Sequence, residues 1–265
     1  MRIVLALACW VGWAAHAAAP PTLSYRVIAE HRHAPMSFTQ GLVIVDGQLI
    51  EGTGLYGESR LSLFELPGLR PLRSTSLDPG EFGEGVAVTP THIFQLTWQS
   101  RRAYVYDRKL QKLGSFPLTS DGWGLAYDGK RLIRSDGSSR LQFLDPERYV
   151  ETGHVVVREG LVEVDQINEL EWVDGRLYAN LWQTDRIAVI DPVSGQIMAW
   201  LDLTGLAERF AKPWNWNARD YVLNGIAFDE RTGHFWITGK YWPLLFEIAV
   251  DLTPLKRNVV TPPRR

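Results

Sequence analysis

The chain repeats one short pattern five times, at intervals close to 45 residues. Each unit opens on a small or acidic residue followed by an aliphatic one, then continues as an alternating run, a turn and a second run. The opening pairs lie 44, 39, 45 and 56 residues apart and are Gly41-Leu42, Gly85-Val86, Gly124-Leu125, Glu169-Leu170 and Gly225-Ile226. A fixed period of this length is the signature of a fold built from repeated structural units.

The turns inside the units indicate β-hairpins. Asp46-Gly47, Asp128-Gly129 and Asp174-Gly175 each separate two alternating runs, and Asp-Gly in that setting is a strong hairpin signal. Most units carry a second hairpin, so each unit reads as four short strands. Four strands per unit, repeated radially, predict an all-β fold of the five-bladed β-propeller type rather than a β-sandwich of similar strands.

Two segments depart from the regular period. The last unit is short, and Leu23 to Ala29 alternates ahead of the first unit. We expect this N-terminal strand to complete the last blade and close the ring, which leaves no open sheet edge. The 56-residue interval contains an insertion at 203–222, in which Leu206 to Phe210 is expected to form a short helix.

The N-terminus resembles an export signal. Met1-Arg2 precedes an apolar run from Ile3 to Ala15, and Ala15-His16-Ala17 fits a small-x-small cleavage site. We predict a signal peptide over 1–19 and one catalytic propeller domain over 20–265, exported to the periplasm or secreted. The single cysteine lies within the leader, so no disulfide or thiol nucleophile is expected afterwards. A net charge of −2 lacks the basic excess of a general nucleic-acid binder.

The repeat predicts which residues meet at one rim of the ring. In a propeller the first strand of each blade lines the central channel, so equivalent positions form rings. The residues just before the opening pairs are Gln40, Glu84, Trp123, Asn168 and Asn224. The positions that end the second strands, on the same rim, are Gly54, Trp98, Asp136, Trp182 and Lys240.

Eleven tryptophans are many for a chain of 265 residues, and three of them fall on this rim. Phe38 and Phe82 lie two residues before ring positions and can reach the same mouth. Aromatic walls with a few convergent polar groups are typical of a ligand pocket. By contrast, Trp172, Trp200 and Trp236 are expected in the core or between blades. His31-x-His33 lacks carboxylate partners, apart from Glu30, so no metal site is expected there.

Nine separated motifs in order resemble the glutaminyl-peptide cyclotransferases of the plant and bacterial type. The motifs are Phe38-Thr-Gln-Gly-Leu42, Glu51-Gly-Thr-Gly-Leu-Tyr56, Phe82-Gly-Glu-Gly85, Leu96-Thr-Trp98, Gly122-Trp-Gly-Leu125, Ile167-Asn-Glu-Leu-Glu-Trp172, Asn180-Leu-Trp182, Leu223-Asn-Gly-Ile226 and Thr238-Gly-Lys-Tyr-Trp-Pro243. The resemblance implies a five-bladed propeller without metal or cofactor. It also implies conversion of the N-terminal glutamine of a peptide or protein to pyroglutamate, with release of ammonia.

The positions that match the family's active site divide by chemistry. Glu84 is the expected general base and acid. Lys240 and Asn168 are the expected hydrogen-bond donors to the oxyanion, and Gln40 orients the reacting groups. The expected substrate-binding walls are Phe38, Phe82, Trp98, Trp123 and Trp182. We expect a monomer without nucleic-acid partner or membrane anchor.

Two other classes of function fit the rim. A metal-dependent lactonase-type propeller needs carboxylates and amides converging on a cation, and Glu84, Asp136, Asn168 and Asn224 are the candidates. A non-catalytic periplasmic propeller would bind a peptide at the rim without converting it. Release of ammonia from a peptide that begins with glutamine distinguishes these functions from cyclisation.

Overall fold

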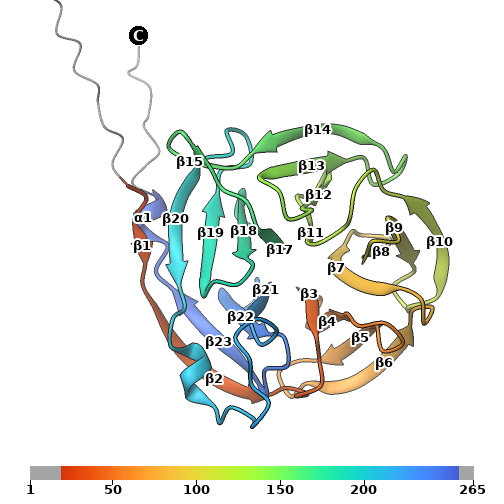
Figure 1. Ribbon diagram of the computed structural model, residues 1–265, viewed down its shortest axis with the longest axis horizontal. Helices are drawn as coiled ribbons and strands as arrows, with labels where there is room; N and C mark the ends of the chain where they lie inside the picture. The colour runs from red at the N-terminus through yellow and green to blue at the C-terminus, as the bar shows by residue number, and fades with distance from the viewer. Residues whose placement is uncertain (1–18, 257–265) are drawn as a thin grey trace, which may run out of the picture.

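Five four-stranded blades surround a central axis in the computed structural model, which describes residues 19–256 (Figure 1). The predicted five-bladed propeller is confirmed. Most of the predicted leader lies outside the described residues, and its removal stays a prediction. Within residues 19–256 no helix is long and apolar enough to span a membrane.

The blades follow one another in chain order, each from its inner to its outer strand. Blade 1 contains β3 (Thr39–Val45), β4 (Gln48–Thr53), β5 (Arg60–Glu65) and β6 (Arg70–Ser76). Blade 2 contains β7 (Phe82–Val88), β8 (Ile93–Trp98), β9 (Arg102–Tyr106) and β10 (Lys112–Pro117). Blade 3 contains β11 (Leu125–Tyr127), β12 (Leu132–Arg134), β13 (Arg140–Leu144) and β14 (Glu151–Val156).

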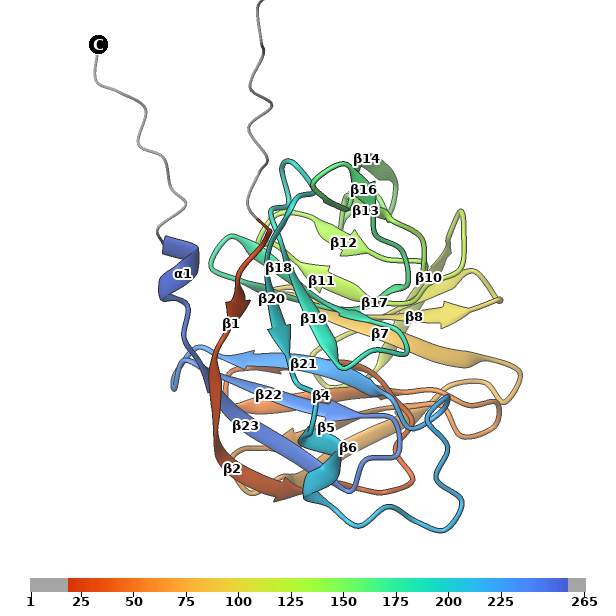
Figure 2. The ribbon, with the colours of Figure 1, turned by 60° about the vertical axis from the view of Figure 1, so that its left-hand side comes forward.

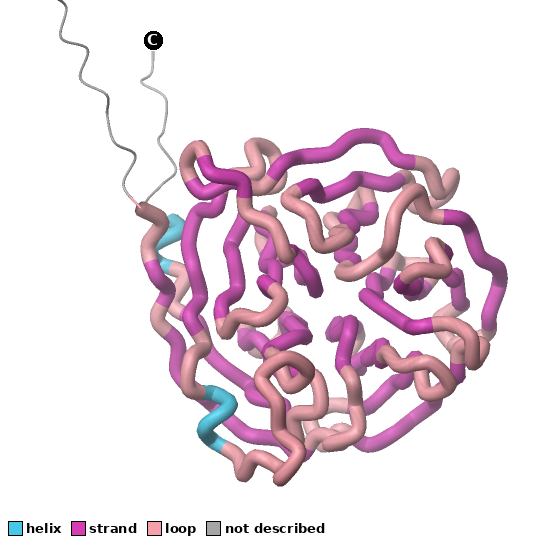
Figure 3. The backbone as a smooth tube through the Cα atoms, viewed as in Figure 1, coloured by secondary structure: helices cyan, strands magenta, loops and turns pink. Residues whose placement is uncertain are grey.

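A small hairpin precedes the last two blades. It is formed by β15 (Arg158–Glu159) and β16 (Val162–Glu163). Blade 4 contains β17 (Ile167–Val173), β18 (Arg176–Leu181), β19 (Arg186–Ile190) and β20 (Ile197–Asp202). Blade 5 contains β21 (Leu223–Asp229), β22 (His234–Gly239) and β23 (Leu244–Val250). The helical segments η1 (Leu206–Arg209) and α1 (Thr253–Lys256) lie at the outer edge of the ring (Figure 3).

The N-terminal segment closes the ring, as predicted. β2 (Tyr25–Arg32) pairs antiparallel with β23 and becomes the outer strand of blade 5. The sequence did not predict β1 (Thr22–Leu23), which adds a short parallel strand to β20 of blade 4. Figure 2 shows this segment running along both blades. The five inner strands also contact one another in a closed cycle, because β21 meets β3.

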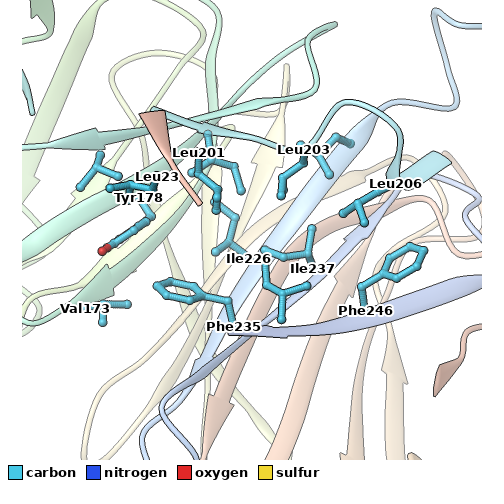
Figure 4. Close-up of a cluster of buried hydrophobic side chains, with 14 of the residues drawn as sticks. Leu23, Val173, Tyr178, Leu201, Leu203, Leu206, Ile226, Phe235, Ile237 and Phe246 are labelled. Atoms are coloured by element: carbon cyan, nitrogen blue, oxygen red, sulfur yellow. The ribbon is translucent and has the colours of Figure 1, made fainter. Parts of the chain in front are cut away.

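The core consists of five apolar clusters, one at each interface between neighbouring blades. Successive side chains of a strand point to opposite faces, so Val86 packs towards blade 1 while Ala87 packs towards blade 3. The cluster between blades 4 and 5 includes Leu23 and Leu206, which dock the N-terminal strand and the insertion (Figure 4). Both faces of each inner strand are therefore buried, and the ring is held together blade by blade.

Candidate active site

Four of the five ring positions lie at irregularities in the inner strands. The pairing register shifts between Thr39 and Gly41 in blade 1 and between Gly83 and Val86 in blade 2. Equivalent shifts occur in blades 4 and 5. A bulge frees the extra residue from the ladder and re-aims its side chain. The side chains that these bulges release are Gln40, Glu84, Asn168 and Asn224.

Close approach of neighbouring inner strands explains the glycines beside the ring. Gly85 donates its N–H to the carbonyl of Trp123 at 2.7 Å. A Cβ at Gly85 would lie 2.5 Å from that same carbonyl oxygen, and a Cβ at Gly124 would overlap the carbonyl oxygen of Asn168. Only glycine allows these contacts, so the opening pairs set the spacing between blades at the level of the ring.

The fourth blade carries Glu169 where its neighbours carry glycine. Its two carboxyl oxygens accept the N–H groups of Leu42 and Ile226, at 3.2 and 2.8 Å. Burial raises the pKa of Glu169 well above its usual range. This side chain connects blade 4 to blades 1 and 5, so it supports the ring rather than the pocket.

One cavity of about 340 Å³ collects all nine residues that match the family's active site. Its wall is formed by Phe38, Gln40, Phe82, Glu84, Trp98, Trp123, Asn168, Trp182, Arg219, Asp220 and Lys240. The nine predicted site residues are among them. Arg219 and Asp220 were missed, because they come from the insertion and have no counterpart in the repeat. The 56-residue interval was the available signal.

A chain of hydrogen bonds orients the carboxyl group of the pocket. Asn224 donates from Nδ2 to the carbonyl of Thr39 at 2.9 Å and to Oε1 of Gln40 at 3.2 Å. Gln40 in turn donates from Nε2 to Oε1 of Glu84 at 3.0 Å. Asn224 is fully buried and does not line the cavity. Its ring position had suggested that Asn224 faces the pocket. It instead holds Gln40 in position from behind the cavity wall.

Two buried ionisable groups, one acidic and one basic, line the same cavity. Burial raises the pKa of Glu84 well above its usual range, and Asp121 adds to this, although the Lys240 ammonium opposes it. Burial lowers the pKa of Lys240 to about 8 against the opposing effects of Glu84 and Asp220. The Nζ of Lys240 also lies 4.7 Å from the ring centroid of Phe38. Both groups are thus tuned towards neutral pH, which is typical of functional sites.

The walls are aromatic and partly exposed. The rings of Trp123 and Trp182 meet edge to face at 5.6 Å, and those of Phe82 and Trp98 do so at the same distance. Phe82 fills the space above Gly54, where a side chain would overlap its ring. Because the Phe82 ring occupies this space, the first blade carries a glycine at its rim position instead of a side chain.

Asn168 presents an unused polar atom. The residue is 3% exposed, and no group within residues 19–256 hydrogen-bonds its Oδ1. Its backbone carbonyl accepts the hydroxyl of Ser135 at 2.7 Å, which holds the residue in place. A buried amide without a partner is costly, so this atom is suited to bind a ligand group.

Asp136, which the repeat placed on the rim, is not among the residues that line the cavity. It lies beyond the end of β12, as Trp182 and Lys240 lie beyond the ends of β18 and β22, but its side chain is held by neighbouring groups. Its carboxylate accepts hydrogen bonds from Ser120, Ser138 and Gln142 and does not line the cavity.

Two of the three tryptophans set apart from the pocket lie between blades as predicted, because Trp200 packs between blades 3 and 4 and Trp236 between blades 5 and 1. The third, Trp172, also packs against the cluster of blades 3 and 4 but in addition lines a separate cavity, which includes Glu171. Trp172 thus packs between blades as predicted and stays outside the cavity that contains Glu84.

His33 belongs to a structural network. Its Nε2 lies 3.0 Å from Oε1 of Glu51, and Thr39 donates its hydroxyl to the same oxygen. Among residues 19–256 no group of three or more histidine, cysteine or carboxylate side chains could hold a metal ion.

The fold and the cavity define a class: a five-bladed propeller whose channel mouth carries a desolvated carboxyl, a lysine and aromatic walls. The model of the family described as "Glutamine cyclotransferase" matches residues 1–250. The chain belongs to this family.

Two relatives show how similar the chain is to known members. The glutaminyl-peptide cyclotransferase of Arabidopsis thaliana is 38% identical over 233 residues, which are 87% of this chain and 72% of that protein. The crystal structure of Myxococcus xanthus glutaminyl cyclase superimposes with a TM-score of 0.78 at 33% identity, over 88% of this chain and 98% of that one. Both likenesses extend over most of the propeller.

Proposed function

We propose that this protein cyclises the N-terminal glutamine of peptides and proteins to pyroglutamate and releases ammonia. Family membership supports the reaction, and one observation supports the site. Glu84, a carboxyl with a raised pKa, lies beside Lys240 and Asn168 in a cavity with aromatic walls. This arrangement suits an acyl transfer within the substrate, which needs proton transfer and oxyanion binding but no nucleophile from the enzyme.

The proton transfers are assigned to Glu84. The neutral α-amine of the substrate attacks its own γ-carboxamide carbon, so that a C–N bond forms and the carbonyl becomes a tetrahedral oxyanion. Glu84 takes one proton from the attacking nitrogen and delivers it to the carboxamide nitrogen. The bond to that nitrogen then breaks and ammonia leaves. A carboxyl whose pKa is raised from its usual range towards the working pH is suited to both transfers.

Lys240 and Asn168 are assigned to the polar atoms of the substrate. The Lys240 ammonium stabilises negative charge on the γ-carbonyl oxygen, in the manner of an oxyanion site. Asn168 uses its amide to hold a substrate N–H or carbonyl group, and its unpartnered Oδ1 supports a role as acceptor. Gln40 holds the Glu84 carboxyl in position.

The aromatic walls are assigned to folding of the substrate side chain. Phe38, Phe82, Trp98, Trp123 and Trp182 surround the space beside Glu84. They hold the glutamine in the bent conformation from which the ring closes. Positioning of this kind removes a large part of the barrier in intramolecular reactions.

We further propose that the reaction needs no metal and that the protein is exported. The donor set of residues 19–256 supports the first point. Dialysis against a chelator is expected to leave the rate unchanged, whereas a lactonase-type metal enzyme would lose its activity. Export predicts that the protein isolated from its host begins close to Ala18, which N-terminal sequencing would show.

The deciding experiment uses a synthetic peptide that begins with glutamine. Incubation with the protein is expected to release one ammonia per peptide, seen both by an ammonia assay and as the matching loss of mass. A peptide that begins with asparagine or N-acetylglutamine serves as control. Binding of the glutamine peptide without ammonia release would contradict the proposal and favour a binding propeller.

A further inference from the structure

The insertion between the fourth and fifth repeats contributes a wall of the pocket that the other blades lack. Arg219 and Asp220 both line the cavity. They lie in the loop that joins η1 to β21, which is the segment responsible for the long interval in the repeat. The loop therefore brings two charged residues to a mouth that is otherwise mainly aromatic.

This loop is held in place by a continuous series of aromatic contacts. Adjacent ring centroids lie 4.6 to 5.9 Å apart, and the series ends at a pocket wall. Its members in order are Trp242, Phe210, Trp216, Tyr221, Tyr241 and Phe38. Trp242 also donates from Nε1 to the carbonyl of Tyr221 at 3.3 Å. Packing of this kind makes the loop a fixed part of the pocket.

The two charges of the loop have different surroundings. Asp220 accepts a hydrogen bond from Nδ2 of Asn217 at 3.1 Å, and its charge raises the pKa of Lys240. The guanidinium of Arg219 makes no hydrogen bond or ion pair to any group within residues 19–256. Arg219 is exposed at the mouth and directed to the cavity. Its five donors form a planar fork that matches a carboxylate.

We propose that Arg219 is a specificity-determining residue that pairs with a carboxylate carried by the substrate beyond its N-terminal glutamine. This inference rests on the proposed cyclisation. The α-amine and the γ-carboxamide must both reach Glu84, so the remainder of the peptide leaves through the mouth, where Arg219 lies. The favoured substrates carry aspartate or glutamate directly after the glutamine, or end in a free carboxylate at that distance.

The test compares kcat/KM for amidated tripeptides that differ only at the second position. We expect wild-type protein to convert Gln-Glu-Ala-amide about three- to tenfold faster than Gln-Lys-Ala-amide, the size of an exposed charge pair gained against one repelled. Arg219→Glu is expected to invert this ratio and Arg219→Ala to bring it close to one. High salt is expected to reduce the wild-type preference, because the mouth is open to solvent.

A second pair of peptides identifies the source of the carboxylate. If the free C-terminus is bound, Gln-Ala is converted faster than Gln-Ala-amide, and Arg219→Ala removes the difference. If an acidic side chain is bound, only the tripeptide series responds. Two results together would overturn the proposal. The ratio of kcat/KM for Gln-Glu-Ala-amide to that for Gln-Lys-Ala-amide would be the same in wild type and Arg219→Glu, and Gln-Ala would react no faster than its amide.

Arg73→Glu provides the matched control. Arg73 lies on the exposed strand β6, away from the cavity, and the variant carries the same change of net charge. It is expected to keep the wild-type ratio. If every peptide releases ammonia at a rate that does not depend on its charge, the role of Arg219 is disproved but the cyclisation is not. No release from any peptide would instead disprove the cyclisation.

Discussion

Gln40 donates a hydrogen bond from Nε2 to Oε1 of Glu84 over 3.0 Å. The amide cannot turn round, because Asn224 donates to its other end. No hydrogen bond within residues 19–256 engages Oε2 of Glu84, so one oxygen is held by the protein and the other is available to substrate. The arrangement fixes the direction of the carboxyl group while leaving its proton-transfer atom free.

Replacing the pocket carboxyl is expected to abolish turnover without loss of structure. Glu84→Gln keeps the shape and removes the proton carrier, so kcat should fall about 10²- to 10⁴-fold. The aromatic walls remain, so binding of a glutamine peptide should persist. Ammonia release measures the first effect and isothermal titration the second. A folded variant with wild-type kcat would disprove the assigned role of Glu84.

Removing the neighbouring cation is expected to move the acid limb of the pH profile. The Lys240 ammonium lowers the pKa of Glu84 against the larger effect of burial. Lys240→Met therefore raises that pKa, and the rise of kcat/KM with pH should begin at higher pH than in wild type. The decline attributable to Lys240, whose pKa is about 8, should disappear. The substrate amine titrates identically in both proteins, so an unchanged acid limb would contradict the coupling.

The close approach of blades 3 and 4 predicts a large effect of one methyl group. The added Cβ in Gly124→Ala overlaps the carbonyl oxygen of Asn168, which is backbone and cannot move alone. We expect a loss of about 1–3 kcal/mol in the free energy of unfolding, measured with urea. Gly114→Ala is the control, because nothing lies within 4 Å of its Cβ position. Equal stability of the two variants would show that the ring adapts.

The pair formed by His33 and Glu51 is expected to make stability depend on pH. Burial alone would lower the pKa of His33, but the Glu51 carboxylate raises it overall. The same pairing lowers the pKa of Glu51 although burial opposes it. The contribution of His33 is thus complete below its ordinary pKa of 6.5 and is lost as pH rises through the raised value. That of Glu51 is complete above 4.5 and is lost as pH falls through the lowered value.

His33→Gln tests this window. Breaking a buried pair costs roughly 3–5 kcal/mol, so the variant should be less stable by about that amount near pH 5.5. The deficit should shrink as the pH is raised towards 9, because folded His33 loses its proton as the pH rises through its raised pKa. Urea unfolding at the two pH values measures it. A deficit of the same size at both would indicate that packing, rather than charge, is the main contribution of His33.

The sequence predicted the ring because the repeat is periodic, and periodicity carries equivalent positions to one rim. Gln40, Glu84 and Trp182 were placed by counting alone. The count could not tell that Asp136 stays out of the cavity, because its carboxylate is held by Ser120, Ser138 and Gln142. It also could not tell that Asn224 points into the ring rather than the pocket, since the direction of a bulged side chain depends on which neighbour bonds it.

Residues outside the period could not be predicted. Arg219 reaches the cavity only because the insertion folds back against the aromatic residues near Phe38, and that contact depends on tertiary packing. β1 adds to blade 4 through two residues, too few for an alternating pattern. The alternating runs correctly predicted strands. Each face of an inner strand packs against a different neighbouring blade, so both faces are apolar.

The pairing of β2 with β23 has a consequence for biosynthesis. His31 and Glu247, which meet across these strands, are 216 residues apart in the sequence. β2 is synthesised early and β23 near the end, so β2 has no partner until most of the chain has been made. Until then the nascent chain exposes an unpaired sheet edge. We expect no partially synthesised chain to be active. The last step in forming the ring therefore joins the two ends of the sequence, and it is possible only after β23 has been made.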